Sequence, residues 1–274
     1  MIPLRDNIPS RTAPVVNYAV IALCGVVFLA QNSVSPEQPS LVERYGMIPV
    51  RISQPGVPVE IAFGVRRVMT AEGPDEEVVT RQAAPSAVPA LLTMLTCIFL
   101  HGGWMHFLGN MWFLHIFGDN VEDRFGHIGY LAFYLACGTA ASAAHYLTDR
   151  NSAIPTIGAS GAIAGVMGAY YVSYPRAKVV TLLPLIIIWQ VVVLPASLFL
   201  GIWFVIQFLQ GTMSVTVAQT TGVAWWAHIG GFAAGASAAW LLGKGGLLRP
   251  PSEAILPRTA GLGGARPPSG RRPW

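Results

Sequence analysis

Apolar stretches of about membrane length recur along most of this 274-residue chain, and they constrain its fold more than any other feature. About 20 apolar residues in a helix cross a bilayer. Hydrophobic residues make up 53% of the chain and charged residues only 11%, against about 25% charged residues in an average soluble domain. The sequence therefore predicts an all-α, polytopic membrane protein with six transmembrane helices. The expected spans are 15–31, 103–119, 127–147, 159–174, 193–210 and 222–243.

Composition outside these spans divides the chain into parts. Residues 1–14 are expected to form a short amino-terminal segment and 15–243 the six-helix domain, in which 32–90 is a long first loop with a small structure of its own. The tail, 244–274, carries six prolines, six glycines and five arginines. A segment of that composition cannot bury enough apolar surface to fold, so we expect the tail to be disordered.

Two stretches flank the fifth expected span. The first, 179–193, is apolar but punctuated by Pro184 and Pro195, and we expect it to be a re-entrant or interfacial lead-in to that span. The second, 211–222, is rich in Thr, Ser and Gln and is bounded by glycine. This composition favours a mobile cap that admits water to a buried site.

The distribution of basic residues indicates an orientation. With both termini placed in the cytoplasm, eleven of the seventeen lysines and arginines lie on the cytoplasmic side, as the positive-inside rule requires. Five of the other six lie in the long first loop, where charge has less influence on topology. We therefore expect both termini in the cytoplasm and the first loop outside. The expected location of this multi-pass protein is a bacterial plasma (inner) membrane.

Polar side chains inside apolar spans are costly, and they mark candidate functional sites. The second expected span carries His106 and Asn110, which share a helix face because they are four residues apart. The fourth span begins at Ser160, and the sixth carries His228. In the expected topology these three spans all run inward from the outer side, with the polar groups in about their first two turns. The four side chains should therefore meet at one buried site in the outer part of the membrane.

A serine beside a histidine is typical of acyl transfer. His228 would take the proton of Ser160 and later give it to the leaving amine. Among thirteen carboxylates only Asp149 lies near the expected site, in an outer loop, so the sequence predicts a Ser–His dyad without an acid. The backbone N–H of Ser160, at a helix amino terminus, with His106 and Asn110, would donate hydrogen bonds to the oxyanion.

These motifs resemble those of the rhomboid family over roughly residues 15–243. An H-x4-H-x3-N element appears as His101, His106 and Asn110, and G-x-S-G as Gly158, Ala159, Ser160 and Gly161. An A-H-x-x-G-x-x-x-G element appears as Ala227, His228, Gly231 and Gly235.

The resemblance implies a six-helix rhomboid bundle and an intramembrane serine endopeptidase. Its partners would be the lipid bilayer and single-span transmembrane substrates, which it cleaves near their outer membrane boundary with the Ser160–His228 dyad. It implies an oxyanion site of His106, Asn110 and the Ser160 amide, with His101 as a structural tether for the first loop. No cofactor or metal is implied. The remaining structural positions would be Gly158, Gly161, Gly231 and Gly235.

Three alternatives stand beside this interpretation. A small transporter would carry charged groups on a path through its core spans, and none appears inside them; the acids of 119–123 stand at the end of the second span. A catalytically silent rhomboid-like binder of membrane proteins typically loses the serine or the histidine, and both are present. A metal protease would carry H-E-x-x-H, which is absent. Nucleic acid is not an expected partner, because the basic residues are scattered.

Overall fold

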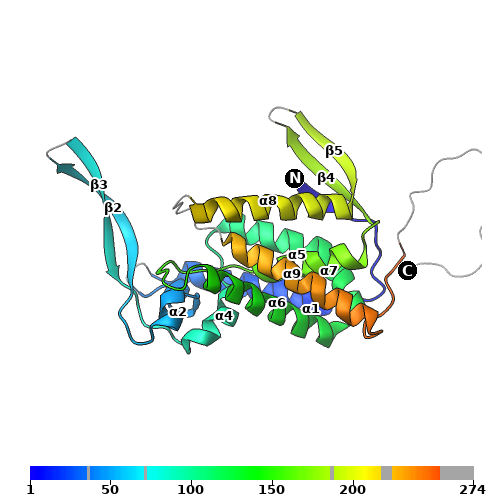
Figure 1. Cartoon of the computed structure of the whole chain (residues 1–274), viewed down its shortest axis with the longest axis horizontal. Helices are drawn as coiled ribbons and strands as arrows, with labels where there is room; N and C mark the ends of the chain where they lie inside the picture. The colour runs from blue at the N-terminus through cyan, green and yellow to red at the C-terminus, as the bar shows by residue number, and fades with distance from the viewer. Residues whose placement is uncertain (36–37, 71–72, 186–187, 217–223, 254–274) are drawn as a thin grey trace, which may run out of the picture.

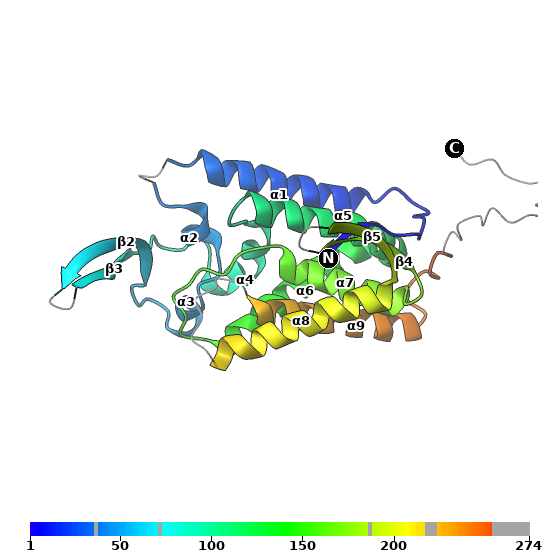
Figure 2. The same ribbon diagram turned by 90° about the horizontal axis from the view of Figure 1, so that it is seen from above.

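The computed structural model describes residues 1–35, 38–70, 73–185, 188–216 and 224–253. Within these residues six long helices lie side by side (Figures 1 and 2). Each overlaps one expected span. Their bounds are α1 Val15–Ser33, α5 Trp104–Phe125, α6 His127–Thr148, α7 Ser160–Ser173, α8 Ala196–Thr216 and α9 Trp225–Lys244.

Length and apolarity qualify some of these helices as candidate membrane spans. Among the described residues α1 and the Ala196–Met213 part of α8 qualify, and the pair Ala90–Phe99 and Trp104–Phe125, bent by 80°, would be a third if it acts as one span. The bundle of long helices is therefore observed, and six membrane crossings stay a prediction.

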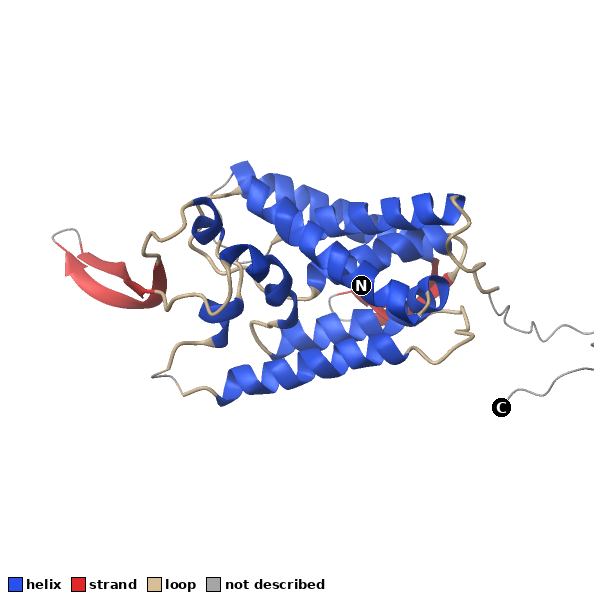
Figure 3. Cartoon of the chain, turned by 90° about the horizontal axis from the view of Figure 1, so that it is seen from below, coloured by secondary structure: helices blue, strands red, loops and turns tan. Residues whose placement is uncertain are grey.

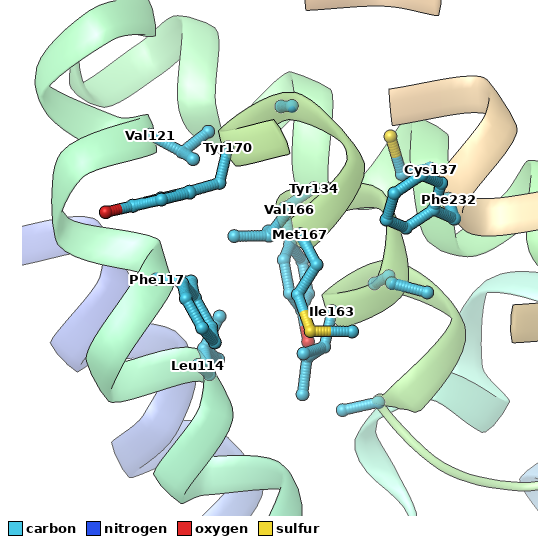
Figure 4. Close-up of a cluster of buried hydrophobic side chains, with 14 of the residues drawn as sticks. Leu114, Phe117, Val121, Tyr134, Cys137, Ile163, Val166, Met167, Tyr170 and Phe232 are labelled. Atoms are coloured by element: carbon cyan, nitrogen blue, oxygen red, sulfur yellow. The ribbon is translucent and has the colours of Figure 1, made fainter. Parts of the chain in front are cut away.

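Helix α7 occupies the centre of the bundle. It contacts α5, α6, α8 and α9, and Figure 2 shows it between α1 and α5 on one side and α8 and α9 on the other. Its residues from Gly161 to Tyr170 are all buried. Large side chains fill the space between α5 and α7, among them Phe117, Met167 and Tyr170 (Figure 4).

Helices α7 and α9 meet backbone to backbone. A Cβ atom built on Gly231 would overlap the carbonyl of Gly161, and one on Gly235 would overlap the carbonyl of Gly165. Gly168 faces the carbonyl of Phe232 in the same way. Small residues permit this approach between helices, so the glycines set the separation of α7 and α9.

Buried polar groups tie α1 to the bundle. The carboxylate of Glu122, near the end of α5, accepts hydrogen bonds from the backbone N–H groups of Val16 and Asn17 at 3.0 and 2.7 Å. Such an acceptor satisfies donors that a helix amino terminus leaves unpaired. The Asn17 side chain then donates to Leu114 O at 3.1 Å and accepts from the Tyr130 hydroxyl at 2.8 Å. These bonds join α1 to α5 and α6.

The prediction of an all-α protein is wrong for residues 179–193, and also for the amino-terminal strand and the hairpin of the first loop. Strands β4 Lys178–Leu185 and β5 Ile188–Pro195 form an antiparallel hairpin there, and β1 Ile2–Arg5 pairs with β4, in the order β1-β4-β5. The reason is local: valines and isoleucines favour strands, and a proline inside a helix breaks it. Helix α8 begins at Ala196, directly after Pro195.

The first loop has the small structure expected of it. It contains the short helices α2 Leu41–Tyr45 and α3 Pro49–Ser53 and a hairpin of β2 Glu60–Thr70 with β3 Gly73–Gln82. The hairpin projects from one end of the bundle (Figures 1 and 3). A short helical segment then leads back to α5 through η1 Ala90–Leu92, α4 Thr93–Thr96 and η2 Cys97–Phe99.

Two other expectations fall partly outside the described residues. The mobile cap expected over 211–222 is wrong for its first half, because α8 continues to Thr216; 217–223 lie outside the described residues. In the tail, Arg249 donates its backbone N–H to Arg124 O at 3.0 Å, so the first residues after α9 pack against the bundle. The disorder expected of 254–274 concerns residues outside the described part.

Candidate active site

Ser160 begins α7 at a turn that requires glycine. Gly158 has φ +128°, a conformation that L side chains rarely adopt, and its N–H donates to Cys97 O at 3.0 Å. A Cβ atom on Gly158 would lie 2.8 Å from Cε1 and Nε2 of His106 and 3.6 Å from Ser160 Oγ. Glycine therefore lets the His106 ring lie against this turn, beside the serine hydroxyl.

The serine and histidine meet as the sequence predicts. Ser160 Oγ lies 2.8 Å from His228 Nε2, although the two residues are 68 positions apart. Ser160 opens α7 and His228 lies in the first turn of α9, and the glycine contacts hold these two helices together. The separation is a hydrogen-bond distance suited to transfer of the hydroxyl proton.

Three side chains surround the rest of the His228 ring. Gln207 Oε1, from α8, lies 2.6 Å from Nδ1. Trp203, one turn earlier in α8, has its ring centroid 5.9 Å from that of His228, and Trp225 packs edge-on at 6.0 Å.

The one carboxylate that the sequence places near the site does not contact the His228 ring. Asp149 is exposed at the end of α6, where its carboxylate accepts from Asn151 N at 3.1 Å. The amide of Gln207 thus occupies the position beside Nδ1 of His228 at which a catalytic triad would have a carboxylate.

The two expected oxyanion donors border the same cavity as the serine. The cavity is about 440 Å³, and its lining includes His106, Asn110, Ser160, Gln207 and His228. His106 Nδ1 accepts from Gly102 N at 3.3 Å, so a neutral ring carries its proton on Nε2, the atom beside Gly158. Asn110 Nδ2 is buried and has no hydrogen-bond partner within the described residues. Both groups can donate toward a reacting carbonyl.

His101 packs against His106 in a cluster of aromatic rings. It is 2% exposed, and its ring packs edge-on against Phe28, His106 and Phe107. Its backbone exchanges two hydrogen bonds with the Gln31 side chain, at 3.0 and 3.1 Å. Gln31 lies near the end of α1, from which the first loop departs. A role for His101 as the tether of that loop stays a prediction.

Comparison with known proteins assigns the family. The model of the Rhomboid domain matches residues 89–245, more than half of the chain. The chain belongs to the rhomboid family. That family includes serine proteases, and the candidate spans agree with an integral membrane protein.

The rhomboid relatives resemble parts of the chain. RHOMBOID-like protein 5 of Arabidopsis thaliana is 38% identical over 76 residues, which are 28% of this chain and 25% of that protein. RHOMBOID-like protein 4 of the same plant is 34% identical over 163 residues, 57% of this chain and 34% of that protein. YdcA of Bacillus subtilis (strain 168), provisionally named a rhomboid protease, is 32% identical over 77 residues, 28% of this chain and 38% of that protein. The chain thus spans well under half the length of each of these relatives.

The rhomboid motifs account for the groups on α5, α7 and α9, but sequence reasoning missed Gln207. The available signal was an amide side chain inside the largely apolar fifth span, one turn after Trp203. Within the described residues no group of three or more His, Cys, Asp or Glu side chains is placed to hold a metal ion.

Proposed function

We propose that this rhomboid protein is an intramembrane serine endopeptidase with Ser160 as nucleophile and His228 as general base. The observation that carries the proposal is the 2.8 Å contact of Ser160 Oγ with His228 Nε2, made beside a cavity that His106 and Asn110 also line. An activated serine needs a base within hydrogen-bond reach, and this pair meets that requirement.

The reaction proceeds in two acyl-transfer steps. Ser160 Oγ attacks the carbonyl carbon of the scissile peptide while its proton moves to His228 Nε2. The resulting oxyanion is stabilised by His106, Asn110 and the Ser160 amide. The C–N bond then breaks as Nε2 gives the proton to the leaving nitrogen, and an ester remains on Ser160. Water attacks this ester by the same route, which releases the carboxylic acid and restores the serine.

The finer features of the proposal follow from the sequence. The substrates are single-span transmembrane proteins, cleaved near their outer membrane boundary. The enzyme domain comprises residues 15–243 and crosses a bacterial plasma (inner) membrane six times with both termini cytoplasmic. The eleven basic residues on the expected inner side support this orientation.

A fluorophosphonate that modifies activated serines tests the proposal directly. Purified protein in detergent should be labelled, and Ser160→Ala should not. Ser173→Ala, near the other end of α7, is the matched control and should label like the unaltered protein. Cleavage of a single-span substrate should follow the same pattern. Labelling that survives Ser160→Ala would exclude Ser160 as the nucleophile, and unaltered protein that neither labels nor cleaves would instead favour the silent binder.

A further inference from the structure

Helix α8 carries a buried amide side chain, that of Gln207, beside the candidate active site. Gln207 is 7% exposed, and α8 carries mostly apolar side chains around it. Burying an amide away from water costs free energy unless it is hydrogen-bonded. The bond that Gln207 makes is to His228, at 2.6 Å, so the amide lies where it affects the proposed reaction.

The chemistry of the amide oxygen decides which nitrogen of His228 carries the proton. An amide oxygen can only accept a hydrogen bond, and a neutral imidazole has one N–H and one acceptor nitrogen. When Oε1 of Gln207 faces Nδ1, the proton must be on Nδ1. Nε2 then presents its lone pair to Ser160 Oγ, which lies 2.8 Å away. The opposite tautomer would place an N–H toward the serine and could not act as a base.

The same contact assists the charged state of the reaction. When His228 takes the proton of Ser160 it becomes an imidazolium, and the amide dipole then accepts a hydrogen bond from a charged donor, a stronger bond than one between neutral groups. An ionised carboxylate in place of Gln207, inside an apolar helix, would itself be costly to bury. An amide supplies the orientation at less cost, which accounts for an amide rather than a carboxylate beside Nδ1 of His228.

We propose that Gln207 is a positioning residue of this site, holding His228 in the tautomer and orientation that let Nε2 accept the proton of Ser160. The proposal rests on the proposed serine endopeptidase function. Trp203 supports the arrangement, because it lies one turn from Gln207 and its ring is inclined 40° to that of His228 at 5.9 Å. Helix α8 therefore contributes two of the groups that orient His228.

The first test compares variants of two glutamines on the same helix. Gln207→Met keeps the length of the side chain and removes the acceptor, whereas Gln210→Met changes an exposed glutamine one turn later. Hydrogen bonds to charged groups are the stronger ones, so we expect Gln207→Met to lower kcat about 10- to 100-fold and to leave KM within about twofold. Gln210→Met should have the kcat of the unaltered enzyme. Gln207→Glu keeps an acceptor at Nδ1 of His228, so its kcat should lie between those of Gln207→Met and the unaltered enzyme.

The second test needs no substitution at Gln207. In protein with ¹⁵N-labelled histidine, NMR at neutral pH should show His228 protonated at Nδ1 and unprotonated at Nε2, with His228→Asn used to assign the signal. Protonation at Nε2 would overturn the proposal, even if Gln207→Met fails to fold. Unchanged kcat in a folded Gln207→Met protein, or an equal loss in Gln210→Met, would also overturn it. Failure of the proposed function gives a different result: either Ser160→Ala retains fluorophosphonate labelling, or the unaltered protein neither labels nor cleaves.

Discussion

At the scale of single residues, the site combines groups of very different character on one cavity wall. Ser160, His228 and Gln207 form a continuous line of two hydrogen bonds, at 2.8 and 2.6 Å. Asn110 Nδ2 is buried without a partner within the described residues. Leaving a buried donor without a hydrogen bond costs about 1–3 kcal/mol. Such a cost is expected where the donor binds a reacting atom of the substrate.

We predict that Asn110→Ala slows turnover without weakening substrate binding. Removing one donor from an oxyanion site typically lowers kcat about 10²–10³-fold, and His106→Ala should have an effect of the same order. The measurements are kcat, KM and thermal unfolding of each variant. Leu108→Ala, at an exposed position of the same helix, is the control. Normal turnover in both Asn110→Ala and His106→Ala would contradict this assignment.

The sequence was sufficient to predict that Ser160, His228, His106 and Asn110 meet, because each is polar within an apolar span and the spans alternate in direction. Gln207 could not be predicted in the same way. Its contact with His228 depends on how α8 is rotated about its own axis, and that rotation is set by packing with α7 and α9. The fifth span carries two amides, Gln207 and Gln210, and the sequence alone does not specify which of them faces His228.

At the scale of elements, the α7–α9 pair and the first loop are held by different forces. The helix pair depends on glycines that allow close backbone contact. The first loop depends on a carboxylate: Glu43 of α2 is 3% exposed and pairs with Arg81 of β3. It also accepts from Ala84 N at 3.0 Å. A small change at one of these glycines, or at Glu43, should therefore have a large effect on stability.

For the helix pair we predict that Gly235→Ala destabilises the protein by about 1–3 kcal/mol, the usual cost of overpacking. The added methyl group would overlap the Gly165 carbonyl, so α7 and α9 would have to separate. Thermal unfolding in detergent gives the stability, and fluorophosphonate labelling gives the state of the dyad. Gly25→Ala in α1 is the control, because its Cβ would make an ordinary contact at 3.7 Å with Phe107. Equal stability of the two variants would argue against backbone contact.

For the first loop we predict a pH-dependent loss of stability that requires Glu43. Burial alone would raise the pKa of Glu43, but Arg81, Ala84 N–H and the Ser40 hydroxyl outweigh it and lower the pKa from 4.5 to about 2. A carboxyl with a lowered folded-state pKa stabilises the fold above its unfolded pKa. That contribution is fully present above about pH 4.5 and falls as the pH drops toward 2.

Comparing Glu43→Gln with the unaltered protein between pH 7 and pH 2.5 tests this prediction. The difference in their unfolding temperatures should be largest near neutral pH and should shrink below pH 4.5. Glu60→Gln, at an exposed position of β2, should behave like the unaltered protein over the whole range. A difference between Glu43→Gln and the unaltered protein that does not change with pH would contradict the assigned role of the ion pair.

At the scale of the whole molecule, the long helices were predictable because about 20 apolar residues in a row leave few other structures in a membrane. The sheet β1-β4-β5 was not, because an apolar run does not distinguish a strand from a helix by periodicity alone. Pairing of β1 with β4 also joins residues 175 to 180 positions apart, a relation that local sequence patterns do not contain.

We predict that the first-loop hairpin and the end of α9 lie on opposite sides of the membrane. Figure 1 shows them at opposite ends of the bundle. A reporter fused after Lys244 should indicate the cytoplasm, and one inserted near Glu76 should indicate the outer side. Reporters on the same side would mean an even number of crossings between these points, which the six-span topology does not allow.

The backbone contact between α7 and α9 also bears on how the protein responds to the thickness of its bilayer. Helices accommodate a thicker or thinner bilayer by tilting, and helices separated by long side chains can slide past each other as they tilt. At the close contacts between α7 and α9 glycine meets carbonyl, so at these points no flexible side chain separates the two backbones and sliding is restricted. The two helices should therefore tilt together, and the separation of Ser160 from His228 should be nearly independent of acyl-chain length.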